Sequence, residues 1–331
     1  MRAPLLAFVV ALVGCVSNEA SPEPDGDQSS AATRVASDLQ PAFRRVVMGR
    51  IYQHDKWTLP AADTYRADRY ATVFERRVAY VCDTYAALDP TFVSGLVRLD
   101  DDETVDGERV ETFKAIRQCI RERVTGHVVR FDVVLNALQY SDPDTIPTAV
   151  KGAELLQQRL EEVRTKLDPD FYFFDFFTVP FNRHDKDWHA DAISHGMDWI
   201  HAHDRFVGGN FWGKNVPKGT DFAAVDDSGG IDDTRAQSAA ILANGGGKLP
   251  LVIHVRNDPQ VPGSEGLKFI SGDLAYRRSV VTSEAALSSD LGCSYGLPVF
   301  FPLRIDGAER FAYDARQDGA MLDVLQKLGS R

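Results

Sequence analysis

Eight short apolar runs organise the chain from Arg45 to its C-terminus, and nearly every one carries a polar or charged residue near its carboxyl end. Most of them are followed by a stretch with helical periodicity, and strands that alternate with helices predict βαβ units and a parallel sheet. Eight such units close into a (β/α)8 barrel of about 250 residues, with its site at the carboxyl ends of the strands. The expected strands are 45–53, 92–100, 128–136, 171–179, 206–212, 249–255, 279–284 and 299–305.

Helical patterns separate most of these runs, and Gly-rich loops stand in place of clear periodicity late in the chain. The expected helices are 67–88, 107–124, 146–167, 188–203, 234–244 and 321–328.

The first residues have the form of a targeting segment, with Arg2 followed by the apolar run Leu5 to Val13. The run is too short to span a bilayer as a helix. It ends in Leu12-Val13-Gly14-Cys15, which resembles the lipobox of bacterial lipoproteins. The resemblance implies removal of residues 1–14, lipid attachment at Cys15 and a place in the bacterial cell envelope, on the periplasmic or the cell-surface face. The alternative is an ordinary secretory signal.

Residues 15–40 carry few large apolar side chains, which predicts a disordered tether, and residues 41–331 have the composition and length of one barrel domain. The net charge of −11 argues against a nucleic-acid partner and against electrostatic binding to anionic lipid. We expect a monomer without a cofactor.

Two cysteines fall in consecutive helical patterns, Cys82 in the first and Cys119 in the second. Consecutive helices are neighbours on the outside of a barrel, and an exported protein is permitted a disulfide. Two buried thiols are the alternative. No two cysteines have the close spacing of a structural zinc site.

Side chains alternate between the two faces of a strand, so the uniformly apolar face must pack on the helices and the other must point inward. Barrel interiors are normally filled with branched apolar residues, yet here nearly every strand carries an inward polar group near its carboxyl end. The inward set is Arg50, Tyr52, His54, Arg98, Asp132, Asn136, Asp175, Asn210, Trp212, His254, Arg256, Asp258 and Glu284. Buried charge is costly unless it is paired, so this set predicts a functional pocket. The alternative is a purely structural lattice, in which arginines neutralise Asp132, Asp175 and Glu284. Those arginines are Arg50, Arg98, Arg130 and Arg304.

Two carboxylates indicate a chemistry: Asp175 ends an aromatic run, and Glu284 ends the expected seventh strand. Glycoside hydrolysis needs one carboxylic acid to protonate the leaving oxygen and a second carboxylate as nucleophile or base. In outline the chain resembles the TIM-barrel glycoside hydrolases, many of which carry one key carboxylate at the end of the fourth strand and another at the sixth or seventh. This resemblance implies that Asp175 and Glu284 are the catalytic pair, with Asp258 as the competing second carboxylate and a carbohydrate as substrate. The Asn-Glu pair often found at the fourth strand is absent.

Two other functions stay open. His54 and His254 facing each other over Asp132 or Asp175 would suit zinc or manganese and a metal-dependent hydrolase. The second open function is that of a lipoprotein with a barrel fold that binds glycans without hydrolysing them. The His-x-His sequence at His201 and His203 ends a helix and is expected at the rim opposite the site.

Overall fold

The computed structural model describes the barrel and its helices, and leaves the first 38 residues and several internal segments undescribed. The described residues are 39–50, 60–99, 104–136, 148–175, 186–210, 216–227, 229–244, 249–255, 265–301, 304–305, 308–309 and 314–329. Nine strands form one parallel sheet: β1 Val46–Arg50, β2 Phe92–Ser94, β3 Arg98–Leu99, β4 Arg130–Asn136, β5 Phe171–Asp175, β6 Phe206–Asn210, β7 Phe222–Asp227, β8 Leu251–Val255 and β9 Ser294–Phe300.

The sheet closes on itself, because its order β2-β1-β9-β8-β7-β6-β5-β4-β3 is completed by pairing between β2 and β4. β2 and β3 both pair with β4 and together make one barrel strand, interrupted at Gly95. Gly95 has a φ of +81°, and a Cβ there would collide with the carbonyl oxygen of Gly49. The result is an eight-stranded (β/α)8 barrel, as the sequence pattern predicts.

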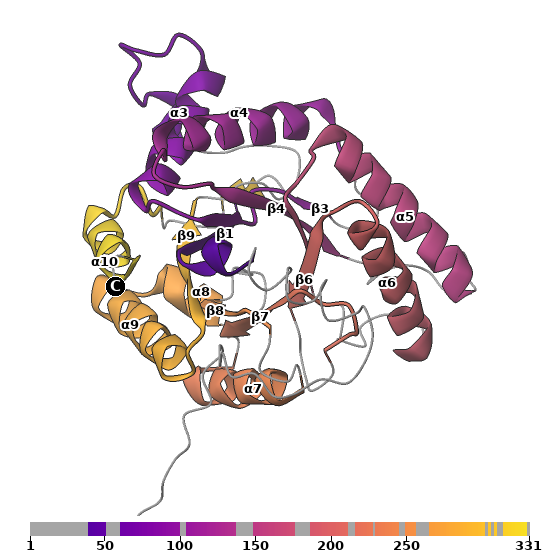
Figure 1. The fold of residues 1–331 in the computed structure, drawn as a ribbon. Coiled ribbons are helices and arrows are strands. Elements are labelled where there is room, and N and C mark those ends of the chain that lie inside the picture. The colour runs from indigo at the N-terminus through magenta and orange to yellow at the C-terminus, as the bar shows by residue number, and fades with distance from the viewer. Residues whose placement is uncertain are drawn as a thin grey trace, which may run out of the picture.

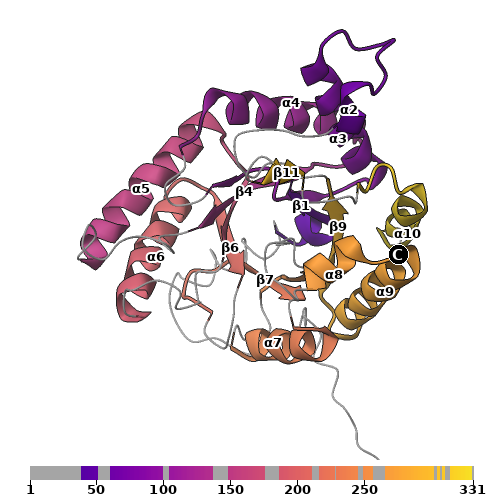
Figure 2. The ribbon, with the colours of Figure 1, turned by 180° about the vertical axis from the view of Figure 1, so that it is seen from behind.

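Helices surround the strands on all sides in both views of the ribbon (Figures 1 and 2). They are α2 Pro60–Asp63, α3 Val73–Ala87, α4 Gly107–Arg123, α5 Ala149–Lys166, α6 Lys186–His201, α7 Ile231–Asn244, α8 Glu265–Ser271, α9 Leu274–Asp290 and α10 Gly319–Gly329. A short antiparallel pair, β10 Arg304–Ile305 and β11 Ala308–Glu309, follows the last barrel strand. None of the helices in these ranges is long and apolar enough to cross a membrane.

The amino end of the barrel is filled by aromatic rings. The short 3₁₀-helix η1, Gln40–Phe43, brings Phe43 against the first residues of three strands, Phe92, Phe171 and Phe222. Gly208 leaves room for this cluster, since a Cβ there would collide with the ring of Phe222. With the amino end packed shut, the open pocket lies toward the carboxyl ends of the strands.

The prediction of the seventh strand is wrong. Residues 279–284 belong to α9, whose buried side chains Val281, Glu284, Leu287 and Ser288 recur at helical spacing. β-branched residues favour strands locally, but the buried stripe against the barrel wall stabilises the helix here. The strand that completes the eight is β7, Phe222–Asp227. It lies between the predicted strand 206–212 and the predicted helix 234–244, where the Gly/Asp-rich sequence predicts a loop. The predicted eighth strand, 299–305, is displaced, because β9 spans Ser294–Phe300.

A disulfide joins α3 to α4. Cys82 and Cys119 are bonded, with Cα atoms 6.1 Å apart. The sequence leaves open a bridge or two buried thiols, and the structure has the bridge. It links two neighbouring helices on the outside of the barrel, as the order of the βα units predicts.

Candidate active site

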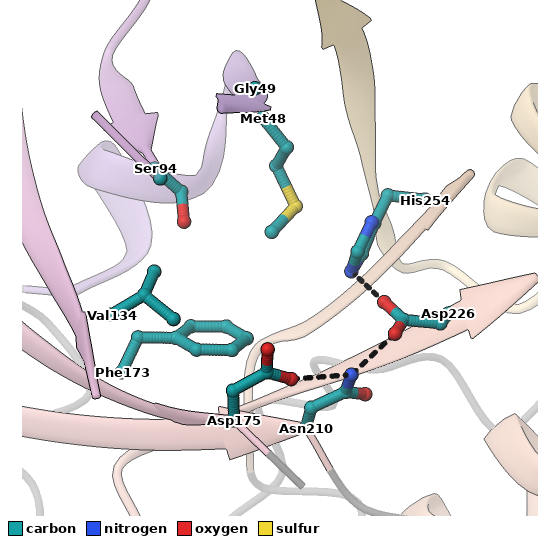
Figure 3. Close-up of a pocket in the computed structure, with 10 residues that line it drawn as sticks. Met48, Gly49, Ser94, Val134, Phe173, Asp175, Asn210, Asp226 and His254 are labelled. Atoms are coloured by element: carbon teal, nitrogen blue, oxygen red, sulfur yellow. Dashed lines mark hydrogen bonds and ion pairs between the residues drawn. The ribbon is translucent and has the colours of Figure 1, made fainter. Parts of the chain in front are cut away.

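A small pocket opens at the carboxyl ends of the strands. The lining residues come from almost every part of the barrel. They are Met48, Gly49, Ser94, Gly95, Val134, Phe173, Asp175, Asn210, Asp226 and His254. Figure 3 shows the polar side chains Asp175, Asn210, Asp226 and His254 in a row along one side, with Ser94 and Met48 on the other.

Asp175 ends β5 and forms a buried ion pair with Arg98 of β3, with 2.8 Å between the carboxylate and the guanidinium. A second guanidinium nitrogen of Arg98 donates to Asn136 of β4 at 3.0 Å. All three side chains are predicted from strand parity to point inward, and the structure brings them together. Because Arg98 is almost fully buried, it places a fixed positive charge beside the pocket carboxylate.

Asn210 of β6 lies between two carboxylates. Its side-chain nitrogen donates to Asp226 Oδ2 at 2.6 Å and to Asp175 Oδ1 at 3.4 Å (Figure 3). Those two oxygens can therefore be no farther apart than the two distances laid end to end, about 6 Å. A single amide thus holds two buried carboxylates, from β5 and β7, at the same edge of the pocket.

His254 of β8 lies 2.6 Å from Asp226 Oδ1 through Nε2, and its Nδ1 lies 3.0 Å from the carbonyl oxygen of Val255. Both ring nitrogens thus face oxygen acceptors, which favours the doubly protonated imidazolium. Burial lowers the pKa of His254, but the charge and hydrogen bond of Asp226 outweigh it, so the pKa lies above its usual value. The pair therefore holds one proton between Nε2 and the Asp226 carboxylate.

Asp132 of β4 lies behind the opposite side of the pocket, with no exposed surface. Ser94 donates its hydroxyl to Asp132 Oδ2 at 2.5 Å, and the Gly95 N–H donates to Oδ1 at 2.9 Å. Burial raises the pKa of Asp132 to about 7, although both hydrogen bonds work in the other direction. Asp132 points inward as predicted, but Ser94 is the residue that lines the pocket.

Glu284 does not lie at this site. Its carboxyl is fully buried on α9, and the groups that shift its pKa upward, after burial itself, include Asp227. Asp227 faces the helices, since it alternates with Asp226 along β7. The barrel wall therefore separates Glu284 from Asp175, and the predicted pairing of these two carboxylates is wrong because Glu284 belongs to a helix.

The residue that sequence reasoning missed is Asp226. The segment 222–227 reads Phe-Ala-Ala-Val-Asp-Asp, an apolar run that ends in polar residues, as the other strands do. A Gly/Asp-rich stretch follows it directly, and such a stretch is typical of a loop, so no strand is predicted there. Ser94 was missed as well, because a lone serine in an apolar run carries no specific indication of function.

Several predicted pocket residues lie outside the described residues. They are Tyr52, His54, Trp212, Arg256 and Asp258, and for Arg50 the structure describes the backbone of β1 but not the side chain. All of them come at or just after the last described residue of a barrel strand in the sequence. Their contribution to the site stays a prediction.

The lattice of paired charges is present only in part. Arg98 neutralises Asp175, whereas Arg130 pairs with Asp170 at the amino end of the barrel, 3.2 Å away. Within the described part of the chain, no ion pair reaches Asp132 or Glu284.

The two histidines of the His-x-His sequence have different partners. His201 contacts Asp221 at 2.8 Å, just before the start of β7, and His203 contacts the carbonyl oxygen of Trp199. Both lie away from the pocket, as predicted. Among the residues that the structure describes, no three His, Cys, Asp or Glu side chains are grouped to hold a metal ion.

Comparison with known proteins defines the class of fold. No family model and no curated protein matches the sequence. Solved structures do resemble it, among them fungal β-1,4-galactanases, with 11% identity over 86% of this chain and 99% of that chain and a TM-score of 0.52. A family 5 xyloglucanase from Paenibacillus pabuli aligns with 8% identity over 87% and 99% of the two chains and a TM-score of 0.51. An exo-β-1,4-mannosidase from Opitutaceae bacterium strain TAV5 aligns with 11% identity over 88% and 61%, with a TM-score of 0.50. The chain thus shares the TIM-barrel fold of glycoside hydrolases.

Proposed function

We propose that the chain is a glycoside hydrolase that acts on a carbohydrate in this pocket, with Asp175 and Asp226 as its two carboxylates. One observation carries the proposal: two buried carboxylates share the amide of Asn210 at the carboxyl ends of β5 and β7. These are the fourth and sixth strands of the barrel, where the sequence resemblance places catalytic carboxylates. The fold shared with glycoside hydrolases supports the same chemistry.

The surroundings of the two carboxylates suit different roles. Asp175 is neutralised by Arg98 and faces the pocket as an anion, which suits a nucleophile. Asp226 contacts the protonated His254, so it can pass a proton from the imidazolium to the leaving oxygen, and the two residues together suit the role of the acid. In the first step a carboxylate oxygen of Asp175 bonds to the anomeric carbon and the glycosidic bond breaks. The leaving oxygen takes the proton that Asp226 receives from His254, which becomes neutral. In the second, Asp226 removes a proton from water, and the water oxygen displaces Asp175.

The distance between the carboxylates supports this order of events. Retaining enzymes separate their carboxyl groups by about 5–5.5 Å, and inverting enzymes by about 6.5–9.5 Å to admit a water. The distance between Asp175 Oδ1 and Asp226 Oδ2 is at most about 6 Å, which is closer to the retaining separation than to the inverting one.

A panel of 4-nitrophenyl glycosides tests the activity. We expect hydrolysis of at least one member of a set of gluco, galacto, manno and xylo configurations in α and β forms. Proton NMR at early times should show the first product with the anomeric configuration of the substrate. Loss of activity on adding a chelator would favour the metal-dependent alternative. Binding of a glycoside without turnover would favour a glycan-binding protein and contradict the proposed hydrolysis.

We also propose that the protein is held in the cell envelope by a lipid on Cys15. The support is the sequence Leu12-Val13-Gly14-Cys15. We expect the protein, produced in a bacterium fed an alkyne analogue of palmitate, to carry the label, and Cys15→Ser to lose it. Equal labelling of both would contradict the anchor.

A further inference from the structure

The side of the pocket opposite the two catalytic carboxylates has its own hydrogen-bonding group. Ser94 lines the pocket at the end of β2, and its hydroxyl is 2.5 Å from Asp132 Oδ2 (Figure 3 shows Ser94). Asp132 has no exposed surface and does not line the pocket, so it reaches a ligand only through Ser94.

Both carboxylate oxygens of Asp132 accept a hydrogen bond, which fixes the orientation of the side chain. Its second oxygen accepts the N–H of Gly95 at 2.9 Å, from the turn that the positive φ of Gly95 allows. The Ser94 hydroxyl therefore has one defined partner behind it, and its remaining hydrogen-bonding capacity faces the pocket. A hydroxyl has one proton and two lone pairs, so what Ser94 offers a ligand depends on which of the two residues holds the shared proton.

We propose that Ser94 binds a hydroxyl group of the carbohydrate, and that Asp132 is a positioning residue that sets whether Ser94 accepts or donates that hydrogen bond. When Asp132 is a carboxylate, Ser94 donates to it and accepts from the ligand. When Asp132 is protonated, it donates to Ser94, whose own proton is then free for the ligand. The inference rests on the proposed function only in that it takes the ligand of the pocket to be a carbohydrate.

The ionised state should bind the ligand more tightly. In that state the ligand hydroxyl, Ser94 and the Asp132 carboxylate form a chain of hydrogen bonds that ends on a charge, and such chains strengthen each member. The pKa of Asp132, raised to about 7 by burial, puts the change between pH 6 and pH 8.

Other ionisable groups lie on the elements packed near Asp132. Tyr85 of α3 is buried, and its pKa is raised by burial and by the charge of Asp132. Arg98 on β3 and Asp175 on β5, further toward the carboxyl ends of the strands, are paired with each other. The side chain of Arg50 on β1 lies outside the described residues. A substitution at Asp132 itself separates its contribution from these groups and from His254.

The test measures binding directly, with 4-nitrophenyl 1-thioglycosides of the same configurations as probes, because their sulfur linkage resists hydrolysis. Isothermal titration calorimetry at pH 6 and pH 8 gives the dissociation constants. We expect the wild-type protein to bind its best probe about fivefold more tightly at pH 8. Asp132→Asn should bind equally at both pH values, since its amide nitrogen donates to Ser94 at either pH and its oxygen still accepts from Gly95.

Ser94→Ala should weaken binding about five- to tenfold, the loss of one hydrogen bond. Ser288→Ala is the matched control, because Ser288 is a buried serine on α9 whose hydroxyl bonds to the backbone of its own helix. Unchanged binding in Ser94→Ala, or a pH dependence in Asp132→Asn equal to that of the wild type, would overturn the inference. Absence of binding by every probe would overturn it too. Probes that bind as expected, without turnover of the oxygen glycosides, would overturn only the proposed hydrolysis.

Discussion

Asp175→Asn is expected to lower kcat on a glycoside substrate by at least about 10³-fold, with the dissociation constant of the matching thioglycoside nearly unchanged. Asparagine has the shape of aspartate and still accepts a hydrogen bond from Arg98, but it cannot form a glycosyl ester. The variant also leaves the buried charge of Arg98 without its counter-ion, so it should be about 1–3 kcal/mol less stable. Activity is therefore measured well below the unfolding midpoint.

Asp168→Asn provides the control. Asp168 lies at the amino side of β5, pairs with Arg205 on the surface and has a φ of +48°, which asparagine adopts readily. Its kcat should equal that of the wild type. If Asp175→Asn retains more than a tenth of the wild-type kcat, Asp175 is not the nucleophile.

Azide separates the two carboxylate roles in a single assay. In Asp175→Ala, azide can attack the anomeric carbon from the vacated side and give a glycosyl azide of inverted configuration. In Asp226→Ala, the ester with Asp175 still forms, and its displacement by azide gives the retained configuration. The opposite pairing of variants and products would exchange the roles assigned to Asp175 and Asp226.

Removal of the disulfide should have the largest effect on stability. The bridge between Cys82 and Cys119 closes a loop with a sequence separation of 37, and the chain-entropy model assigns such a loop about 4 kcal/mol. We expect the double variant Cys82→Ser/Cys119→Ser to lose free energy of unfolding of that order. Urea unfolding followed by circular dichroism at pH 7 measures it.

A reductant supplies the control for this variant. It should lower the unfolding midpoint of the wild type toward that of the double variant, and leave the double variant unchanged. Equal midpoints for the oxidised wild type and the double variant would show that the bridge contributes nothing to stability.

The local pattern of the sequence is enough to predict the barrel fold and to place the site at the carboxyl ends of its strands. Periodic apolar runs report which residues must be buried, and strand parity then assigns each polar residue to a face. That reasoning placed Arg98, Asp132, Asn136, Asp175, Asn210 and His254 inside the barrel, as the structure has them. It depends only on local pattern, and it holds for these six residues, whose strands are correctly assigned.

The carboxylate that accompanies Asp175 depends on tertiary packing. Residues 279–284 and 222–227 are both short segments that end in acidic residues, and local propensity does not tell a strand from a buried helix segment at that length. Packing against the barrel wall made the first a helix and carried Glu284 to the outer face. The second became β7, because its pairing with β6 and β8 closes the sheet, and this turned Asp226 toward Asn210 and His254. The partner of Asp175 is thus a consequence of barrel closure, a contact between distant parts of the chain that no local pattern contains.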